Sequence, residues 1–239
     1  MNNISLHDLR EATPVKSYID GPLALVLCRY LSPMVSLPSI KWGITPNTIT
    51  LLMVVSGIIG GILFMIPYPI LKYFSIPMFI LWYIFDCADG EVARFTKQFS
   101  KYGKQMDWIA HLSCHSLLLI GIWLSFYQKG EENMYFISLM TLSCMSAELI
   151  GRNLIAFDSF LFDNKRFSEQ EDQSFNLLRY VKIQICYFPN FVVFFPIFFF
   201  VDDIFNLCSI YYIYLIWGGL ICIYGIKEYI RYTLYFYKN

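Results

Sequence analysis

The chain has 239 residues, of which 57% are hydrophobic and only 15% are charged. A soluble domain has roughly 45–50% apolar and about 25% charged residues, so much of this apolar surface must face lipid rather than one soluble core. The formal net charge of zero argues against nucleic acid as a partner.

The N-terminal part, residues 1–46, is predicted to be a cytoplasmic or interfacial lead. Ser17 to Ile40 alternate apolar blocks with charged residues and several prolines, which is too interrupted for a membrane span. This pattern predicts an amphipathic helix that lies along the cytoplasmic interface. No signal peptide is expected, because the first long apolar stretch follows a charged lead of about forty residues.

Long apolar runs predict six membrane-spanning helices, since a span needs roughly 20 apolar residues. The expected spans are Thr48 to Pro67, Lys72 through Phe85 and onward, Asp107 to Lys129, Met134 to Ala156, Lys182 to Asp202, and Asp203 to Lys227. The expected fold is therefore an all-α polytopic membrane protein. We expect a single domain over residues 1–239, with the six-helix bundle over 47–232.

Small residues recur at helical spacing in the first span. Ser56 and Gly60 form one such pair, and Gly57 and Gly61 form another. They could mark a place where a ligand approaches the helix. Close packing of helices is the simpler interpretation, because small residues allow two helix backbones to come together in a membrane.

The distribution of basic residues predicts the orientation. If the N-terminus is cytoplasmic, the outer loops hold only Lys72 and Lys129 of the 18 basic residues. Such a bias places both termini and residues 86–107 in the cytoplasm. The polar stretch from Asp158 to Val181 is then a solvated cytoplasmic loop.

Acidic residues gather where the second span ends and the third begins. Asp86 and Asp89 are three residues apart and share a helix face, and Asp107 and His111 share another at a spacing of four. If a short turn brings the two helices together, three carboxylates and an imidazole converge at the membrane surface. Carboxylates near lipid are costly without a cation, and oxygen-rich sites of this kind suit Mg²⁺ or Mn²⁺ bound with substrate phosphates.

Residues beside these carboxylates could hold a phosphorylated ligand. Gly90 and Ala93 leave room for a base or sugar to approach the helix backbone. Arg94 can bind a phosphate oxygen with its fork of donors. Alternatively, all these residues are merely interfacial charges at a helix end, an interpretation that the full spaced set over residues 86–111 weakens.

This spaced set resembles the motif of the CDP-alcohol phosphotransferase family, also called CDP-alcohol phosphatidyltransferases. That motif reads Asp, two residues, Asp-Gly, two residues, Ala-Arg, about eight residues, Gly, three residues, Asp, three residues, Asp. The chain matches it except at the last position, where His111 replaces Asp. The segment from Pro46 to Thr50 is similar to the one with which the family contacts its nucleotide-linked donor.

The resemblance implies a site for two divalent ions, Mg²⁺ or Mn²⁺. Its ligands would be Asp86, Asp89, Asp107 and His111, with His111 also the general base. The substrate-binding residues that it implies are Asn47, Thr48, Ile49, Thr50, Gly90, Ala93, Arg94, Ser100 and Gly103.

The resemblance also implies the reaction. A phosphoalcohol group, phosphatidyl or similar, would pass from a CDP-linked donor to a hydroxyl of a lipid or alcohol acceptor, with release of CMP, in phospholipid or related lipid synthesis. The enzyme would work among membrane lipids, with its active site at the cytoplasmic face, as a homodimer.

Other functions stay open at this point. Histidine can bind a metal and accept a proton, but a neutral nitrogen suits Mg²⁺ less well than a carboxylate. The chain could be an inactive homologue that binds a CDP-lipid. Alternatively, His111 is only a packing residue and the general base lies elsewhere. The chain could also be a transporter whose carboxylates bind a cation. Glu148 and Arg152, inside the fourth span, either line the acceptor pocket or form a self-neutralising ion pair. His115, four residues after His111 on the same helix face, either supports His111 or is a buried helix residue.

Overall fold

A computed structural model describes residues 5–13, 21–161 and 177–238. These residues form helices and contain no strand. Six spans are long and apolar enough to cross a membrane, which confirms an all-α polytopic membrane protein. The helices of these spans are α4 (Pro46–Met65), α6 (Ser75–Thr96) preceded by the short α5 (Pro69–Tyr73), α7 (Gly103–Gln128), α8 (Met134–Leu161), α10 (Phe188–Phe205) and α11 (Ile210–Lys238).

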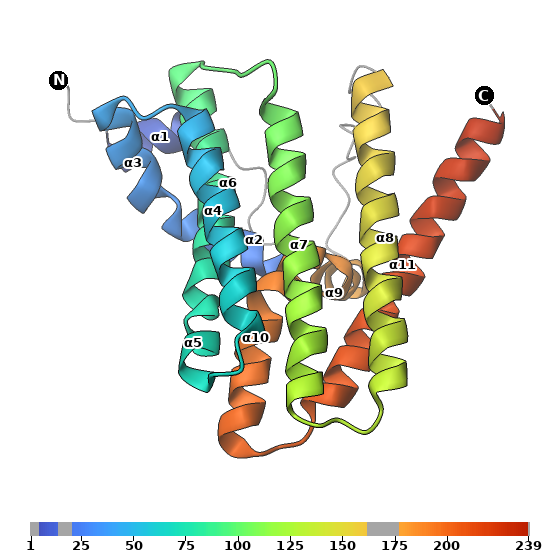
Figure 1. The fold of residues 1–239 in the computed structure, drawn as a ribbon. Coiled ribbons are helices and arrows are strands. Elements are labelled where there is room, and N and C mark those ends of the chain that lie inside the picture. Colours follow the sequence, from blue (N-terminus) through green and yellow to red (C-terminus); the bar gives the residue numbers. More distant parts are fainter. Residues whose placement is uncertain (1–4, 14–20, 162–176, 239) are drawn as a thin grey trace.

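The long helices run side by side along one direction (Figure 1). The α6–α7 connection lies at one end of the bundle, together with α1 (Leu6–Ala12) and the last turns of α11. The α7–α8 and α10–α11 turns lie at the opposite end. Both ends of the described chain therefore share a side with the α6–α7 connection, as the basic residues predict, and the assignment of that side to the cytoplasm stays a prediction.

Glycines in α4 allow α6 and α7 to pack closely against α4. A β-carbon on Gly57 would lie 2.9 Å from Cβ of Cys114 and 2.9 Å from Cδ1 of Trp82. A β-carbon on Gly61 would lie 2.5 Å from Cβ of Leu117. The small residues of the first span are thus packing sites, as predicted, and they bring together the two helices that carry the carboxylates.

The expected start of the fifth span at Lys182 is wrong. Lys182 lies inside a separate helix, α9 (Leu177–Cys186), and α10 begins only at Phe188. Tyr187 has an extended backbone between them, and Pro189 lies in the first turn of α10, where a proline is well tolerated.

The sixth span also differs from its expected bounds, because Asp202, near the end of α10, caps the start of the next helix. The Asp202 carboxylate accepts hydrogen bonds from the backbone N–H groups of Ser209 (2.7 Å) and Ile210 (3.0 Å). Asn206 has a positive φ of 49° that stops α10. The last helix therefore begins at Ile210, not near Asp203, and it continues beyond Lys227 to Lys238.

Where one interfacial helix is predicted over Ser17 to Ile40, the described residues form two helices. They are α2 (Leu23–Leu31) and α3 (Pro33–Trp42), and they are bent by 41° at the break before Pro33. By length and composition the pair also passes as one broken span, so the interfacial location stays a prediction. Residues 14–20 lie outside the described residues.

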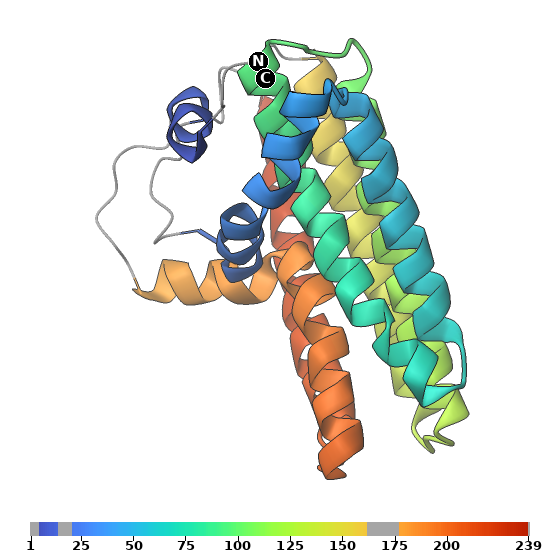
Figure 2. The same cartoon turned by 90° about the vertical axis from the view of Figure 1, so that its left-hand side faces the viewer.

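Two helices lie across the bundle rather than along it (Figure 2). α9 extends sideways from the bundle with α2 beside it. Gln184 of α9 joins them, because its Oε1 accepts from the Leu23 N–H (2.7 Å) and its Nε2 donates to the Gly21 carbonyl (3.0 Å). Asn190 of α10 accepts from the Ala24 N–H at 2.9 Å.

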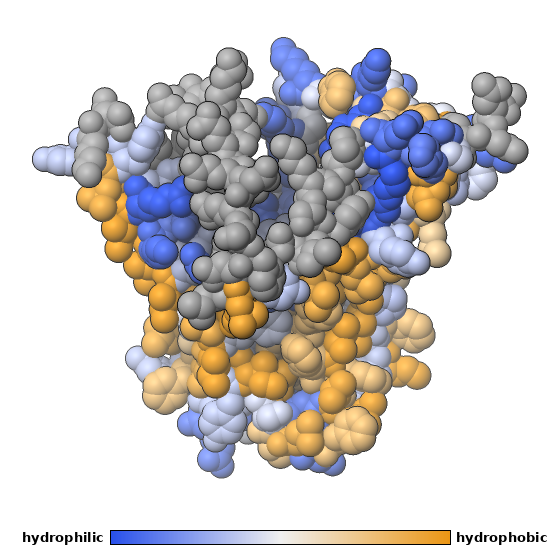
Figure 3. All heavy atoms as spheres, turned by 180° about the vertical axis from the view of Figure 1, so that it is seen from behind, coloured by the Kyte–Doolittle hydropathy of each residue, from blue (hydrophilic) through white to orange (hydrophobic). Residues whose placement is uncertain are grey.

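The surface hydropathy changes along the bundle axis. On the face in Figure 3, apolar side chains gather in the lower part and hydrophilic ones toward the end that holds the α6–α7 connection. The solvated loop predicted for Asp158 to Val181 is partly wrong, because α8 continues to Leu161 and α9 already begins at Leu177. The rest of that stretch, 162–176, lies outside the described residues.

Candidate active site

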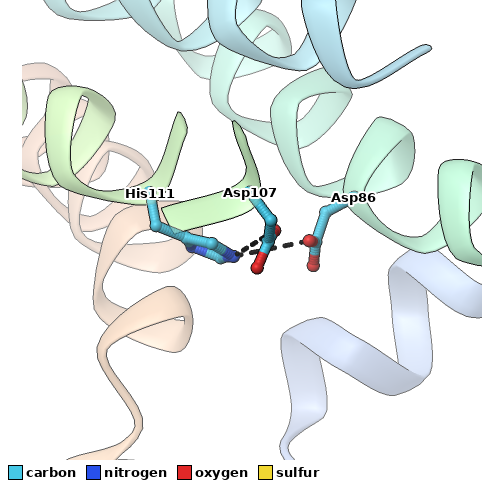
Figure 4. Close-up of side chains that lie close together, drawn as sticks. All are labelled: Asp86, Asp107 and His111. Atoms are coloured by element: carbon cyan, nitrogen blue, oxygen red, sulfur yellow. Dashed lines mark ion pairs between the residues drawn. The ribbon is translucent and has the colours of Figure 1, made fainter. Parts of the chain in front are cut away.

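Three predicted metal ligands converge between α6 and α7 (Figure 4). The Nε2 atom of His111 lies 3.4 Å from Oδ1 of Asp86 and 3.4 Å from Oδ1 of Asp107. One ligand atom from each residue lies within 4.8 Å of the others. The imidazole therefore faces both carboxylates, one from each helix.

Local structure explains this convergence. α6 ends at Lys97, which has a positive φ of 56°, and α7 begins six residues later at Gly103. The short connection keeps the two helices adjacent. The Trp82 ring of α6 contacts the His111 ring edge to face, with centroids 5.0 Å apart and planes at 90°, and so limits the orientations open to the imidazole.

The fourth predicted ligand, Asp89, has a different immediate partner. Its Oδ2 accepts a hydrogen bond of 2.6 Å from the Thr50 hydroxyl of α4. Asp89 is still close enough to Asp86 and Asp107 for their negative charges to interact. The structure therefore brings Asp89 to the edge of the cluster, while Asp86, Asp107 and His111 form its centre.

The donor set fits a divalent cation. Two carboxylate oxygens and one imidazole nitrogen suit Mn²⁺, and Mg²⁺ with additional oxygen ligands from water or phosphate. Three neighbouring carboxylates repel one another unless positive charge is added between them. The three residues could therefore hold a metal ion. Asp86 and Asp107 remain partly open to solvent, with 20% and 45% of their side chains exposed.

The predicted nucleotide-contact segment forms the first turn of α4. Thr45 is the N-cap, and its hydroxyl accepts from the Thr48 N–H at 3.3 Å. The side chains of Asn47 and Thr48 are exposed and open to a ligand. The Ile49 side chain is fully buried against Ala88 and Val92 of α6, so it anchors the segment instead of facing a ligand.

Arg94 lies against Gly90 on α6. A β-carbon on Gly90 would lie 3.1 Å from one terminal nitrogen of the Arg94 guanidinium. The Arg94 side chain is exposed, and neighbouring Ala93 is half-buried. A larger residue at Gly90 would displace this guanidinium, so the two residues form one surface beside Asp89.

Ser100 and Gly103 belong to the turn before α7. The Ser100 hydroxyl accepts from the Tyr102 N–H at 3.2 Å, and the Gly103 N–H donates to the Ser100 carbonyl at 3.3 Å. A β-carbon on Gly103 would meet only Ser100, at an ordinary 3.6 Å. Among the described contacts, these two residues shape the turn and do not touch the carboxylates.

The buried Glu91 lies within the motif, but its role does not follow from the sequence. Its carboxylate accepts hydrogen bonds from the hydroxyls of Ser32 (2.8 Å) and Ser36 (2.6 Å) at α3, and it pairs with Arg10 of α1 at 3.1 Å. Arg10 also donates to the Arg29 carbonyl of α2 at 2.6 Å. The only sign of its role in the sequence is its position between two motif residues. Its partners Ser32, Ser36 and Arg10 are too distant in the chain to be predicted from spacing.

Comparison with known protein families matches residues 43–217 to CDP-alcohol phosphatidyltransferase. The matched region begins just before the α4 segment and contains every residue of the carboxylate cluster. A search of curated proteins found no match.

Proposed function

Because the chain belongs to the CDP-alcohol phosphatidyltransferase family, we propose that it transfers a phosphoalcohol group from a CDP-linked donor to an acceptor hydroxyl and releases CMP. The observation that carries this proposal is the convergence of Asp86, Asp107 and His111 at one point between α6 and α7. The transfer serves lipid synthesis, as the family's activity does in general.

Residues around the cluster supply the donor site. The exposed Asn47 and Thr48 at the head of α4 face the nucleotide, and Arg94 binds a phosphate oxygen over the small surface of Gly90. Ala93, Ser100 and Gly103 border this surface. The hydrogen bond from Thr50 to Asp89 holds the nucleotide segment at a fixed distance from the carboxylates.

The chemical step is an in-line displacement at the phosphorus that carries the donor's alcohol. The acceptor oxygen forms a new bond to that phosphorus, and the bond from phosphorus to the oxygen of CMP breaks. The electron pair leaves with CMP. The acceptor's hydroxyl proton passes to Nε2 of His111, the ring nitrogen that faces the site.

Asp86, Asp89, Asp107 and His111 would hold two divalent ions, Mg²⁺ or Mn²⁺. When bound, these ions would neutralise the negative charge that develops on the leaving phosphate. The protein's own contribution is to keep the carboxylates on two packed helices, so that their positions do not depend on a mobile loop.

The geometry of His111 makes its two proposed roles compete. Only Nε2 faces the carboxylates, whereas Nδ1 is buried and has no hydrogen-bond partner among the described residues. One lone pair cannot bind a metal and accept a proton at the same moment. We propose that His111 acts as the base during transfer, and that the ions rely mainly on the three aspartates.

The second candidate function is an inactive homologue that binds a CDP-lipid. The presence of His111 at the position of the family's last Asp favours it. A CMP-release assay separates the two functions. The assay uses purified protein in lipid nanodiscs with Mg²⁺ or Mn²⁺. One reaction contains CDP-diacylglycerol and polar alcohols, and the other contains CDP-choline and diacylglycerol.

Release of CMP that EDTA abolishes and added metal restores supports the transferase. Asp107→Asn should abolish release, while Lys104→Gln, an exposed residue on the same turn of α7, should not. No CMP release from any donor, together with retained binding of a CDP-lipid, would establish the inactive homologue. CMP release that continues unchanged in EDTA would contradict the metal site.

We further propose that residues 1–239 form one domain, with the lead over 1–46 and the bundle over 47–232. The end of the bundle with the α6–α7 connection faces the cytoplasm, as the positions of the basic residues indicate. Two copies form a homodimer, in keeping with the family resemblance.

A further inference from the structure

A second polar cluster lies beside the candidate active site. On α8, Nε of Arg152 donates to Oε1 of Glu148 at 2.9 Å. Nδ1 of His115, from α7, contacts the same oxygen at 2.6 Å. The His115 ring lies 5.4 Å from the His111 ring, measured between centroids. The cluster is therefore one helical turn from the base proposed above.

Charged residues inside a membrane-spanning helix cost free energy, so those that occur there usually have a function. His115 is fully buried, while 14% of the Glu148 side chain and 21% of the Arg152 side chain are exposed. A pair formed only to cancel two charges needs no histidine. Here His115 fixes Glu148 and Glu148 fixes Arg152, which is the arrangement of a supported binding group.

The way in which Arg152 is held leaves its outer edge available. The bond to Glu148 uses Nε–H, one of five donors on the planar guanidinium. No hydrogen bond of the two terminal nitrogens is found among the described residues. The bond from Nε to Glu148 fixes the orientation of the planar guanidinium. The two terminal nitrogens are then free to make a bidentate contact with a carboxylate or phosphate.

Arg152 lies near enough to the carboxylate cluster for its charge to act on it. Its charge interacts with the carboxylate of Asp107 and with the phenol of Tyr187, at the start of α10. The Tyr187 hydroxyl is hydrogen-bonded to that of Tyr83 on α6 at 2.9 Å. Charged and hydroxyl groups from α6, α7, α8 and α10 thus surround one side of the site.

Buried polar atoms without partners are a second feature of this side that favours a polar ligand. Nε2 of His115 and Nε1 of Trp82 are both buried and have no hydrogen-bond partner among the described residues. Their rings contact each other, with centroids 5.4 Å apart. Leaving such atoms unpaired is unfavourable, and a small polar molecule, or water that accompanies it, would satisfy them.

We propose that the acceptor is a small, water-soluble alcohol that carries an anionic group, and that Arg152 binds this group while Glu148 and His115 orient Arg152. This inference rests on the proposed transferase function and defines its acceptor. The acyl chains then belong to the CDP-linked donor. An acceptor made of acyl chains would place apolar groups against the charged groups of this side.

The test measures CMP release from CDP-diacylglycerol in nanodiscs with four acceptors. Glycerol 3-phosphate tests a phosphate, serine tests a carboxylate, glycerol tests a neutral polyol, and diacylglycerol tests a lipid acceptor. A separate reaction with CDP-choline as the donor and diacylglycerol as the acceptor tests the opposite placement of the acyl chains. We expect glycerol 3-phosphate or serine to support release at concentrations at least tenfold below glycerol. The better of the two identifies the anionic group.

Variants assign the effect to Arg152. Arg152→Gln should raise the KM for the anionic acceptor at least tenfold and leave the KM for CDP-diacylglycerol within twofold. Arg152→Lys should recover part of the loss, because it restores charge but not the fork. Glu148→Gln should raise the acceptor KM with little change in kcat. Arg231→Gln is the matched control, since Arg231 pairs with Glu228 on α11 at 3.2 Å, and it should change neither KM.

Thermal unfolding gives a readout that does not need turnover. The anionic acceptor with Mg²⁺ should raise the Tm of the native protein and not that of Arg152→Gln. Equal stabilisation of both proteins, or release that proceeds equally well with glycerol or only with diacylglycerol, would overturn the acceptor assignment while the transferase function stands. An absence of CMP release with every donor and acceptor would overturn both.

Discussion

Thr50 of α4 donates a hydrogen bond of 2.6 Å to Asp89 of α6, and this bond connects the nucleotide segment to the carboxylate motif. A hydrogen bond to a charged group contributes about 1.5–3 kcal/mol. Thr50→Val keeps the shape of the side chain but removes the donor. The freed Asp89 carboxylate should then be less well placed, and we expect at least a tenfold rise in the metal concentration needed for half-maximal CMP release.

Thr50→Ser is the control for this prediction, because it keeps the hydroxyl. It should stay within about threefold of the native metal requirement, a difference that corresponds to roughly 0.6 kcal/mol. An unchanged metal titration for Thr50→Val would show that Asp89 does not depend on Thr50.

The buried Glu91 should stabilise the N-terminal helices against the motif helix. Glu91→Ala leaves the hydroxyls of Ser32 and Ser36 without their acceptor and removes the partner of Arg10. Since each buried polar group that loses its partner costs about 1–3 kcal/mol, we expect a clear fall in the Tm of the purified protein. Faster proteolysis within residues 5–42 should accompany it.

Glu132→Ala provides the comparison, because Glu132 is exposed at the other end of the bundle. Its Tm and its proteolysis pattern should match those of the native protein. If Glu91→Ala unfolds like Glu132→Ala, the network around Glu91 does not hold the lead in place.

Close packing at Gly61 predicts a second effect on stability. Gly61→Ala would place a β-carbon 2.5 Å from Cβ of Leu117, which forces α4 and α7 apart. Overpacking of this kind costs about 1–3 kcal/mol, so the Tm should fall. Gly151→Ala on α8 meets no atom within 4 Å and should leave the Tm unchanged or raise it. Equal Tm values for the two variants would contradict the packing.

The parts of the fold that the sequence predicts are those set by local composition. Long apolar runs identify the six spans, and the spacing from Asp86 to His111 identifies the helices that meet. The errors lie where side chains act over a distance. Asp202 caps α11 across a turn, and Gln184 holds α2 beside α9, so neither boundary follows from hydropathy.

The site shows the same division. Helical spacing places Asp86 and Asp107 correctly near each other, because one face of each helix carries them. It does not reveal that Asp89 bonds to Thr50 or that the Ile49 side chain is buried, since both depend on how α4 packs against α6. The His115–Glu148 contact depends in the same way on α7 and α8.

Orientation in the membrane can be tested by labelling. In a cysteine-free background, a cysteine at Lys101 in the α6–α7 connection should react only with reagents that enter the cytoplasm. A cysteine at Glu132, in the turn at the opposite end, should react with impermeant reagents added outside sealed cells. The reverse pattern would show that the candidate active site faces outward, and labelling of both positions from outside would indicate leaky cells.

His111 separates an active enzyme from an inactive homologue. A positioned base accelerates proton transfer by roughly 10²–10⁴-fold. His111→Ala should therefore lower kcat by an amount in that range while it leaves binding of the CDP donor largely intact, because Asp86, Asp89 and Asp107 remain. His111→Asp should keep substantial activity and shift the metal preference toward Mg²⁺, since a carboxylate oxygen suits that ion better than a ring nitrogen. Its pH profile should extend further toward acid, because a carboxylate stays ionised at a pH where an imidazole is protonated.

His115→Ala is the control variant for His111, since His115 contacts Glu148 and neither Asp86 nor Asp107 in the described contacts. It should change the acceptor KM more than kcat. A native protein that releases no CMP but gains this activity on His111→Asp would be an inactive homologue. A His111→Ala variant as fast as the native enzyme would place the base elsewhere.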